Sequence, residues 1–129
     1  MSLFEAIQWS ARGAFPGDSL EQIQTLWGKP LSFDDKELYT YRESPRLAAL
    51  VKNGRATTLY SDVVWAGAPF LQRGDSREQV HLMLGAPTDP GKLSSMRPPH
   101  YESYDGAGIR LMINFHDDEV TGFVLSARA

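Results

Sequence analysis

The chain has 129 residues, of which 42% are hydrophobic and 22% charged, and its formal net charge at pH 7 is −3. This length suits one domain or two small units sharing a core, and the composition is that of a soluble globular protein rather than a disordered one. The acidic balance argues against a general binder of nucleic acid or anionic membranes, and the absence of cysteine excludes a disulfide framework, a thiolate metal site and a lipid-modified cysteine.

The first residues of the chain favour a helix. Phe4, Ile7 and Ala11 recur at helical spacing, which predicts a helix over residues 2–11. This segment has no basic region and no long apolar run, so we expect neither a signal peptide nor a membrane span. We therefore expect a cytoplasmic protein; the alternative is a periplasmic or envelope protein whose export signal has been removed.

A stretch of fourteen residues then occurs twice. Residues 17–30 and 74–87 are identical at seven of these fourteen positions, and the pairs Ile23/Val80 and Leu26/Met83 stay apolar. The retained residues are of the kind that begin and end helices, and apolar side chains follow at helical spacing. The repeat predicts helices over residues 18–27 and 75–84, in equivalent places of a duplicated unit.

Each copy carries its own start and stop signals. An aspartate followed three residues later by a glutamate can form a capping box, and a glycine followed by a proline ends a helix. We assign all of these residues a structural role as caps rather than a catalytic one. They are Asp18, Glu21, Gly28 and Pro30 in the first copy and Asp75, Glu78, Gly85 and Pro87 in the second.

Strand patterns follow each predicted helix. Alternating and β-branched residues predict strands over residues 37–43, 46–52 and 55–61, and Asn53-Gly54 predicts a type I′ hairpin between the last two. In the second half, residues 63–71 are an apolar connector and residues 88–99 are a loop. Strands are predicted over residues 100–104, 109–116 and 119–126, with Asp117-Asp118 as the turn between the last two.

These elements give an α+β fold made of two tandem units, each a helix plus a three-stranded antiparallel sheet. The six strands form one continuous or facing sheet with the helices on one side. The whole is a single domain over residues 1–129, with the first unit over residues 1–62 and the second over residues 63–129.

The alternation of the central strands separates a core face from an outer face. Leu111, Ile113 and Phe115 point toward the helices, so their neighbours point away from them. A sheet face that mixes apolar and charged side chains suits a partner protein, and tyrosine and arginine are frequent interface anchors. Tyr39 and Tyr41 share a face that the pattern leaves open. The candidate partner-binding residues are Arg46, Leu50, Lys52, Arg110, Met112, Asn114, His116, Tyr39 and Tyr41.

The repeated motif resembles a known family. The pattern Gly-Asp-Ser-x-x-Gln-Val-x-x-x-x-Gly-x-Pro, followed by an aromatic strand and an apolar hairpin, is similar to the SmpA/OmlA unit. That unit occurs singly in small outer-membrane lipoproteins of the barrel-assembly machinery and in tandem in the β-lactamase inhibitor protein (BLIP) group. The resemblance implies a BLIP-like fold, in which a concave sheet with helices behind it grips a partner protein. The inhibitor relatives usually carry disulfides, which this chain cannot form.

The sequence shows no catalytic constellation. It has no Gly-x-Ser-x-Gly elbow, no phosphate-binding loop and no histidine or carboxylate set at metal-ligand spacing, so we expect no metal and no cofactor. His81 is expected to face solvent. The leading hypothesis is a non-enzymatic protein-binding module, an inhibitor or immunity-type protein that binds no nucleic acid. The alternatives are an envelope assembly factor and, third, a small hydrolase or ligand-binding enzyme.

Overall fold

The computed structural model describes residues 9–34, 37–43, 46–65, 71–88, 101–106 and 108–127. Two helices, α2 (Leu20–Trp27) and α3 (Arg77–Leu84), accompany two antiparallel sheets. The smaller sheet has the order β1 (Ser10–Ala11), β6 (Val63–Trp65), β7 (Leu71–Gln72). The larger has seven strands in the order β2 (Ser32–Phe33), β3 (Leu38–Arg42), β4 (Leu47–Lys52), β5 (Arg55–Ser61), β10 (Glu119–Ala127), β9 (Ile109–His116), β8 (Tyr101–Asp105).

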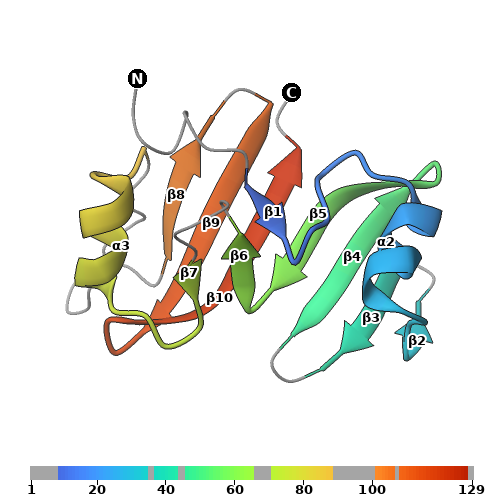
Figure 1. The fold of residues 1–129 in the computed structure, drawn as a ribbon, viewed down its shortest axis with the longest axis horizontal. Coiled ribbons are helices and arrows are strands. Elements are labelled where there is room, and N and C mark those ends of the chain that lie inside the picture. Colours follow the sequence, from blue (N-terminus) through green and yellow to red (C-terminus); the bar gives the residue numbers. More distant parts are fainter. Residues whose placement is uncertain are drawn as a thin grey trace.

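The prediction of an α+β chain with antiparallel strands is confirmed. The strands of the two halves join in one continuous sheet, because β5 pairs with β10 at its centre. Both helices and the smaller sheet lie against the same face of the seven-stranded sheet, with α2 and α3 toward its two ends (Figure 1). Between these layers lies one core cluster, which includes Ile23 of α2, Val80 of α3 and a row of leucines paired across the central strands, Leu59, Leu125 and Leu111.

The opposite face of the seven-stranded sheet, here called the outer face, is not covered by any helix or strand of the described residues. Its side chains alternate with the buried ones along each strand. On β9, for example, Leu111, Ile113 and Phe115 are buried while Met112 and Asn114 are half-exposed. This arrangement confirms the direction predicted for the central strand.

The N-caps lie one residue after the predicted caps, and the helices begin at Leu20 and Arg77, two residues after the predicted starts at residues 18 and 75. The N-caps are Ser19 and Ser76, whose hydroxyls accept the backbone N–H of Gln22 and Gln79 at 3.1 and 3.0 Å. The Gln22 side chain completes the first capping box by accepting the Ser19 N–H at 2.8 Å. Aspartate and serine are nearly equally favourable as N-caps, so the sequence Gly-Asp-Ser did not specify which of its last two residues is the N-cap.

The cap assignments of Asp18, Glu21, Asp75 and Glu78 were therefore wrong. The two aspartates instead close the turn before each helix, because their carboxylates accept the N–H of Phe15 and Gln72, both at 2.9 Å. The two glutamates lie exposed in the first helical turn, where a negative charge is favourable.

Gly28 and Gly85 end the two helices as predicted, though in a different conformation. Their φ angles are +87° and +78°, which suit glycine, but their ψ angles near −159° and −158° are not those of the left-handed helical cap. Each donates its N–H to a helix carbonyl, of Gln24 at 2.8 Å and of His81 at 2.9 Å. Pro30 and Pro87 follow at the expected distance and lie outside the helices.

The hairpin turns follow the sequence closely. Asn53 and Gly54 both have positive φ, 53° and 77°, as a type I′ turn requires. Asp117 and Asp118 have φ of 51° and 61°, so the acidic pair forms the corresponding turn between β9 and β10. The long strands agree with the predicted ranges to within one residue at each end, except that residue 100 lies outside the described residues.

The prediction of a helix over residues 2–11 was wrong for the part of this segment that the structure describes. Residues 2–8 lie outside the described residues, and residues 10–11 form β1. Helical spacing misled the prediction because Trp9, Ser10 and Ala11 are buried one after another, which fits a strand between two layers. The predicted connector at residues 63–71 also contains β6 and the start of β7, and its residues 66–70 lie outside the described residues, as does most of the predicted loop at residues 88–99.

Two buried tyrosines next to the helices differ in hydrogen bonding. The Tyr104 hydroxyl donates to the Gly85 carbonyl at 2.9 Å. The Tyr41 hydroxyl is buried without a hydrogen-bond partner; Gln24 approaches it without the geometry of a hydrogen bond. Tyr41 packs instead edge-on against Trp27, with ring centroids 5.3 Å apart.

We expect Tyr104→Phe to lower the free energy of unfolding by about 1 kcal/mol, because a buried hydrogen bond is lost. Tyr41→Phe removes only an unpaired hydroxyl and should leave stability unchanged or raise it by up to about 1 kcal/mol. Urea unfolding of the two variants checks this difference. A Tyr41→Phe variant that loses as much stability as Tyr104→Phe contradicts it.

Candidate functional site

A groove of about 430 Å³ lies in the outer face and is here called the outer groove. It runs over the junction of β5, β10 and β9. Its floor lacks a side chain at Gly122, which faces Asn114 across a bulge in the pairing of β10 with β9. The lining residues are Arg46, Tyr60, Ser61, Asp62, Met112, Asn114, Thr121, Gly122, Phe123 and Val124.

Arginine and tyrosine form one wall of this groove. The Arg46 guanidinium lies over the Tyr60 ring, 4.1 Å from its centroid, which holds the cation in place by a cation–π contact. Arg46 is exposed, and no carboxylate of the described residues forms an ion pair with it. Its in-plane N–H groups are therefore free to bind an anionic group of a ligand.

Asp62, at the same end of the groove, joins two further arginines. Its Oδ1 and Oδ2 each accept a hydrogen bond from Arg12 at 3.0 Å, and Oδ1 also accepts one from Arg42 at 2.7 Å. Burial of the carboxyl acts to raise its pKa, but the hydrogen bond and charge of Arg12, together with Arg42, outweigh it and lower the pKa of Asp62 below 3.8. Two guanidinium groups thus engage the one carboxylate that lines the groove among the described residues, and this carboxylate forms no ion pair with Arg46.

Asp62→Asn should lower the free energy of unfolding at neutral pH by about 1–3 kcal/mol, because hydrogen bonds to an ionised group are lost. The lowered pKa stabilises the fold above the carboxyl's ordinary pKa, and this contribution disappears as the pH falls through the folded-state value below 3.8. Denaturant unfolding of wild type and variant between pH 7 and pH 3 should therefore show curves that converge on the acid side. A difference that stays constant across this range contradicts the role of the Asp62 charge.

The outer groove brings together three of the predicted partner-binding residues, Arg46, Met112 and Asn114. Leu50 lies further along the outer face, opposite Thr58, and Lys52 is exposed beside the Asn53-Gly54 turn. Arg110 and His116 are already paired. Arg110 donates to both oxygens of Asp105, at 2.7 and 3.3 Å, and exposed His116 lies 3.4 Å from Asp117 at the tip of the hairpin.

Tyr39 and Tyr41 lie on the opposite face, toward the helices. Tyr39 pairs with buried Ala49 and packs against the core, and its ring lies 4.5 Å from that of Phe33. Tyr41 is 93% buried within the core cluster. The open question of which face these tyrosines occupy is thus answered, and neither belongs to the outer groove.

The candidate list from the sequence did not include the groove residues of β5 and β10, nor Asp62 between β5 and β6. Those of the two strands are Tyr60, Ser61, Thr121, Gly122, Phe123 and Val124. Side chains alternate between the two faces of a strand, so Tyr60, next to buried Leu59, faces outward. The alternation used for residues 109–116 could have been applied to residues 55–61 as well. Gly122 could have been recognised as a glycine inside a strand pattern, which often marks a bulge or an open surface. No local signal indicates that Asp62 would meet Arg12 and Arg42, since these residues are distant in the sequence.

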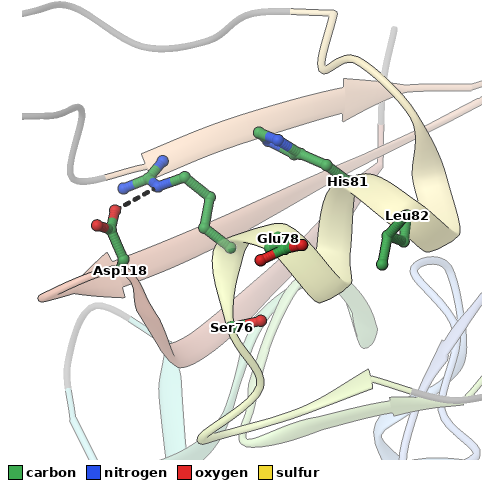
Figure 2. Close-up of a pocket in the computed structure, with 6 residues that line it drawn as sticks. Ser76, Glu78, His81, Leu82 and Asp118 are labelled. Carbon is green, nitrogen blue, oxygen red and sulfur yellow. Dashed lines mark hydrogen bonds and ion pairs between the residues drawn. The ribbon is translucent and has the colours of Figure 1, made fainter.

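A second groove, of about 540 Å³, lies beside α3 (Figure 2). It is lined by Ser76, Arg77, Glu78, His81, Leu82 and Asp118. Beneath it Glu102 is buried, with 4% of its surface exposed, and it accepts a hydrogen bond from Arg77 at 2.7 Å. His81 Nε2 lies 2.7 Å from the other Glu102 oxygen, so His81 is not simply a solvent-facing residue.

Arg77 is fully engaged by this network. It also donates to Asp118 at 2.8 Å and lies over the Phe115 ring at 4.2 Å. Burial acts to lower the pKa of Arg77, but the bonds and charges of Asp118 and Glu102 raise it above its ordinary value, so the cation is permanent. The network ties α3 to β8 and to the β9–β10 turn, which is a structural task, and it leaves no guanidinium edge for a ligand.

The described residues contain no group of three or more histidines or carboxylates that could hold a metal ion. None of the helices among them is long and apolar enough to cross a membrane.

Three solved structures share this fold. One is an extracellular protein containing an SCP domain from Bacillus anthracis, with a TM-score of 0.63 and 10% identity over 88% of this chain and 44% of that one. Another is the DUF4309 family protein YjgB of Bacillus subtilis, with a TM-score of 0.59 and 11% identity over 89% of this chain and 82% of that one. The third is the cysteine-rich secretory protein SAV1118 of Staphylococcus aureus, with a TM-score of 0.55 and 11% identity over 92% of this chain and 45% of that one.

No protein-family model and no curated protein matches the sequence. The chain spans less than half of the first and third structures. The resemblance to the SmpA/OmlA unit and to the BLIP group was wrong, because the similar folds are those of DUF4309 and SCP-containing extracellular proteins. The repeated motif consists of helix caps and turns, which different families use for the same physical reasons.

Proposed function

We propose that this protein is a non-enzymatic binding module that holds another protein on its outer face. The observation that carries the proposal is the outer groove, which opens on the face that the described helices leave bare. Arginine, tyrosine and methionine, which are enriched at protein interfaces, line it as Arg46, Tyr60 and Met112. Inhibition of the partner, expected from the sequence, stays a prediction.

The proposal places this binding outside the cytoplasm. Two of the three similar structures are described as an extracellular and a secretory protein. This favours the alternative of an exported protein over the cytoplasmic location that the start of the sequence suggested.

A duplicated scaffold is also part of the proposal. Matching backbone hydrogen bonds join each helix start to the neighbouring hairpin, from Leu20 N–H to Gly54 at 3.0 Å and from Arg77 N–H to Asp118 at 2.8 Å. The two serine caps and the two left-handed hairpin turns match in the same way. On this view the outer face is built from the last strands of both units, β5 and β10.

Retention of partner proteins on the immobilised chain tests this function. Wild type, Gly122→Leu and Met112→Asp are each exposed to the secreted and cellular proteins of the source organism, and the retained proteins are quantified by mass spectrometry. Gly122 has ordinary φ, and a Cβ there would meet only the Ser61 carbonyl oxygen at 3.7 Å, so the backbone accepts a side chain, and we expect leucine to fill the groove without unfolding the sheet.

We expect proteins that bind wild type to be retained at least tenfold less by both groove variants, which corresponds to about 1.4 kcal/mol. Thr25→Lys, on the exposed side of α2, is the matched control and should retain them as wild type does. Circular dichroism confirms that each variant is folded. If all four proteins retain the same set, the outer face is not the binding surface.

A further inference from the structure

We infer that the outer groove binds an extended acidic peptide segment, and that Arg46 is the residue that binds its carboxylate. This inference rests on the proposed function and specifies the chemistry of the partner. It combines three features of the groove: an unpaired guanidinium at one end, a neighbouring carboxylate that is already engaged by other arginines, and an apolar floor beyond it.

The first feature is the geometry of Arg46. Its guanidinium is stacked on Tyr60 and so is held flat, with the edge that carries its N–H groups left open. A carboxylate can accept two parallel hydrogen bonds from such an edge, and because the fork is already oriented, less conformational entropy is lost on binding. Asp62 lies in the same groove but does not take this role, since Arg12 and Arg42 already bind its oxygens.

The second feature is the local charge. The whole chain has a net charge of −3, yet Asp62, the one carboxylate that lines the groove among the described residues, is engaged by Arg12 and Arg42 and forms no ion pair with Arg46. Elsewhere on the outer face Arg110 is neutralised by Asp105. The charge of Arg46 therefore remains available to attract an anionic partner and to fix its orientation.

The third feature, the apolar floor of the groove, favours a peptide over other anionic ligands. Next to Arg46 the groove passes over Met112 and Val124, which pair with each other across β9 and β10, and over the bare backbone at Gly122. Such a floor suits the apolar side chain that follows an aspartate or glutamate in a peptide. A nucleic acid or an anionic lipid surface needs several free cations, whereas among the described residues Arg46 is the one cation that lines the groove.

Fluorescence anisotropy with short labelled peptides tests the inference. The probe alternates glutamate with valine, and its counterpart carries lysine in place of each glutamate. We expect saturable binding of the glutamate peptide to the full chain, weakening as salt is raised, and no binding of the lysine peptide. Arg46→Glu should weaken binding of the glutamate peptide at least tenfold, and Arg46→Lys should weaken it less, because the charge remains while the planar fork is lost.

Matched variants and probes make the result decisive. Lys29→Glu reverses an exposed positive charge just beyond α2, outside the groove, and should leave binding within about twofold of wild type. A single-stranded oligothymidine and vesicles containing phosphatidylglycerol serve as the other anionic probes. Tighter Arg46-dependent binding of either one overturns the assignment of a peptide, and so does the absence of saturable binding of the glutamate peptide to wild type.

The two proposals fail in different ways. If Gly122→Leu abolishes retention of partner proteins but Arg46→Glu does not, the outer face is the binding surface, and the inference that it binds an acidic peptide segment is wrong. If neither change affects retention, the proposed function itself is wrong. Arg46 is exposed and its ring partner Tyr60 remains, so Arg46→Glu should stay folded, which thermal unfolding verifies.

Discussion

Arg77→Met is expected to lower the free energy of unfolding by about 3–5 kcal/mol. The change leaves the Glu102 carboxylate, of which only 4% is exposed, without its main counter-charge inside the protein. Methionine retains an apolar stem but loses the guanidinium that lies over the Phe115 ring, so the loss reports mainly on the charge and its contacts. Equilibrium unfolding in urea at pH 7 measures the effect.

The double variant Arg77→Met/Glu102→Gln separates this cause from a general loss of contacts. Removing the charge of Glu102 as well should recover a large part of the lost stability, giving a coupling energy well above that of an exposed pair. Arg110→Met serves as the comparison: its side chain is 48% exposed and that of its partner Asp105 11%, so we expect a smaller cost, of about 1 kcal/mol. Equal losses for Arg77→Met and Arg110→Met contradict the importance of the buried network.

A second large effect is expected at the centre of the sheet. Ile113→Ala should cost about 2–5 kcal/mol, because Ile113 is fully buried between the sheet and the layer of helices and leaves a cavity when truncated. The adjacent residue Met112 points to the outer groove, and Met112→Ala should cost less than about 1 kcal/mol. Thermal and urea unfolding of the two variants compare the two faces of one strand.

This pair of substitutions also tests whether the outer face is open. If Met112→Ala is as destabilising as Ile113→Ala, then Met112 is packed as a core residue and cannot serve as a docking surface. A small effect on stability combined with loss of partner retention is the result that the proposed function requires. Val124→Ala, across the strand pair from Met112, should behave as Met112→Ala does.

The long strands were predictable because burial alternates along them. Residues 109–116 form β9 as expected, since a strand with one face in the core shows its period of two directly in the sequence. The strands β1, β6 and β7 have only two or three residues each, too few to show a period, and their pairing joins segments far apart in the chain. The N-caps were displaced by one residue because Asp18 and Ser19 are equally good caps.

The candidate site was predictable only in part. Alternation from Ile113 was sufficient to place Met112 and Asn114 on the outer face. The groove itself depends on a residue without a side chain, Gly122, and on the register of β5 with β10, which no local pattern specifies. The network of Arg77 with Glu102 likewise joins a helix to a distant strand, and the charge of each residue alone gives no indication of its partner.

The place of β10 in the sheet has a consequence for synthesis on the ribosome. β10 is the last described strand along the chain, yet it lies at the centre, between β5 and β9. Until it has emerged, β5 is an edge strand whose unpaired backbone groups and Leu59 side chain are open to other chains. The sheet can close only after β10 has been synthesised, so the nascent protein passes through a stage in which pairing of β5 with a second copy competes with its pairing to β10.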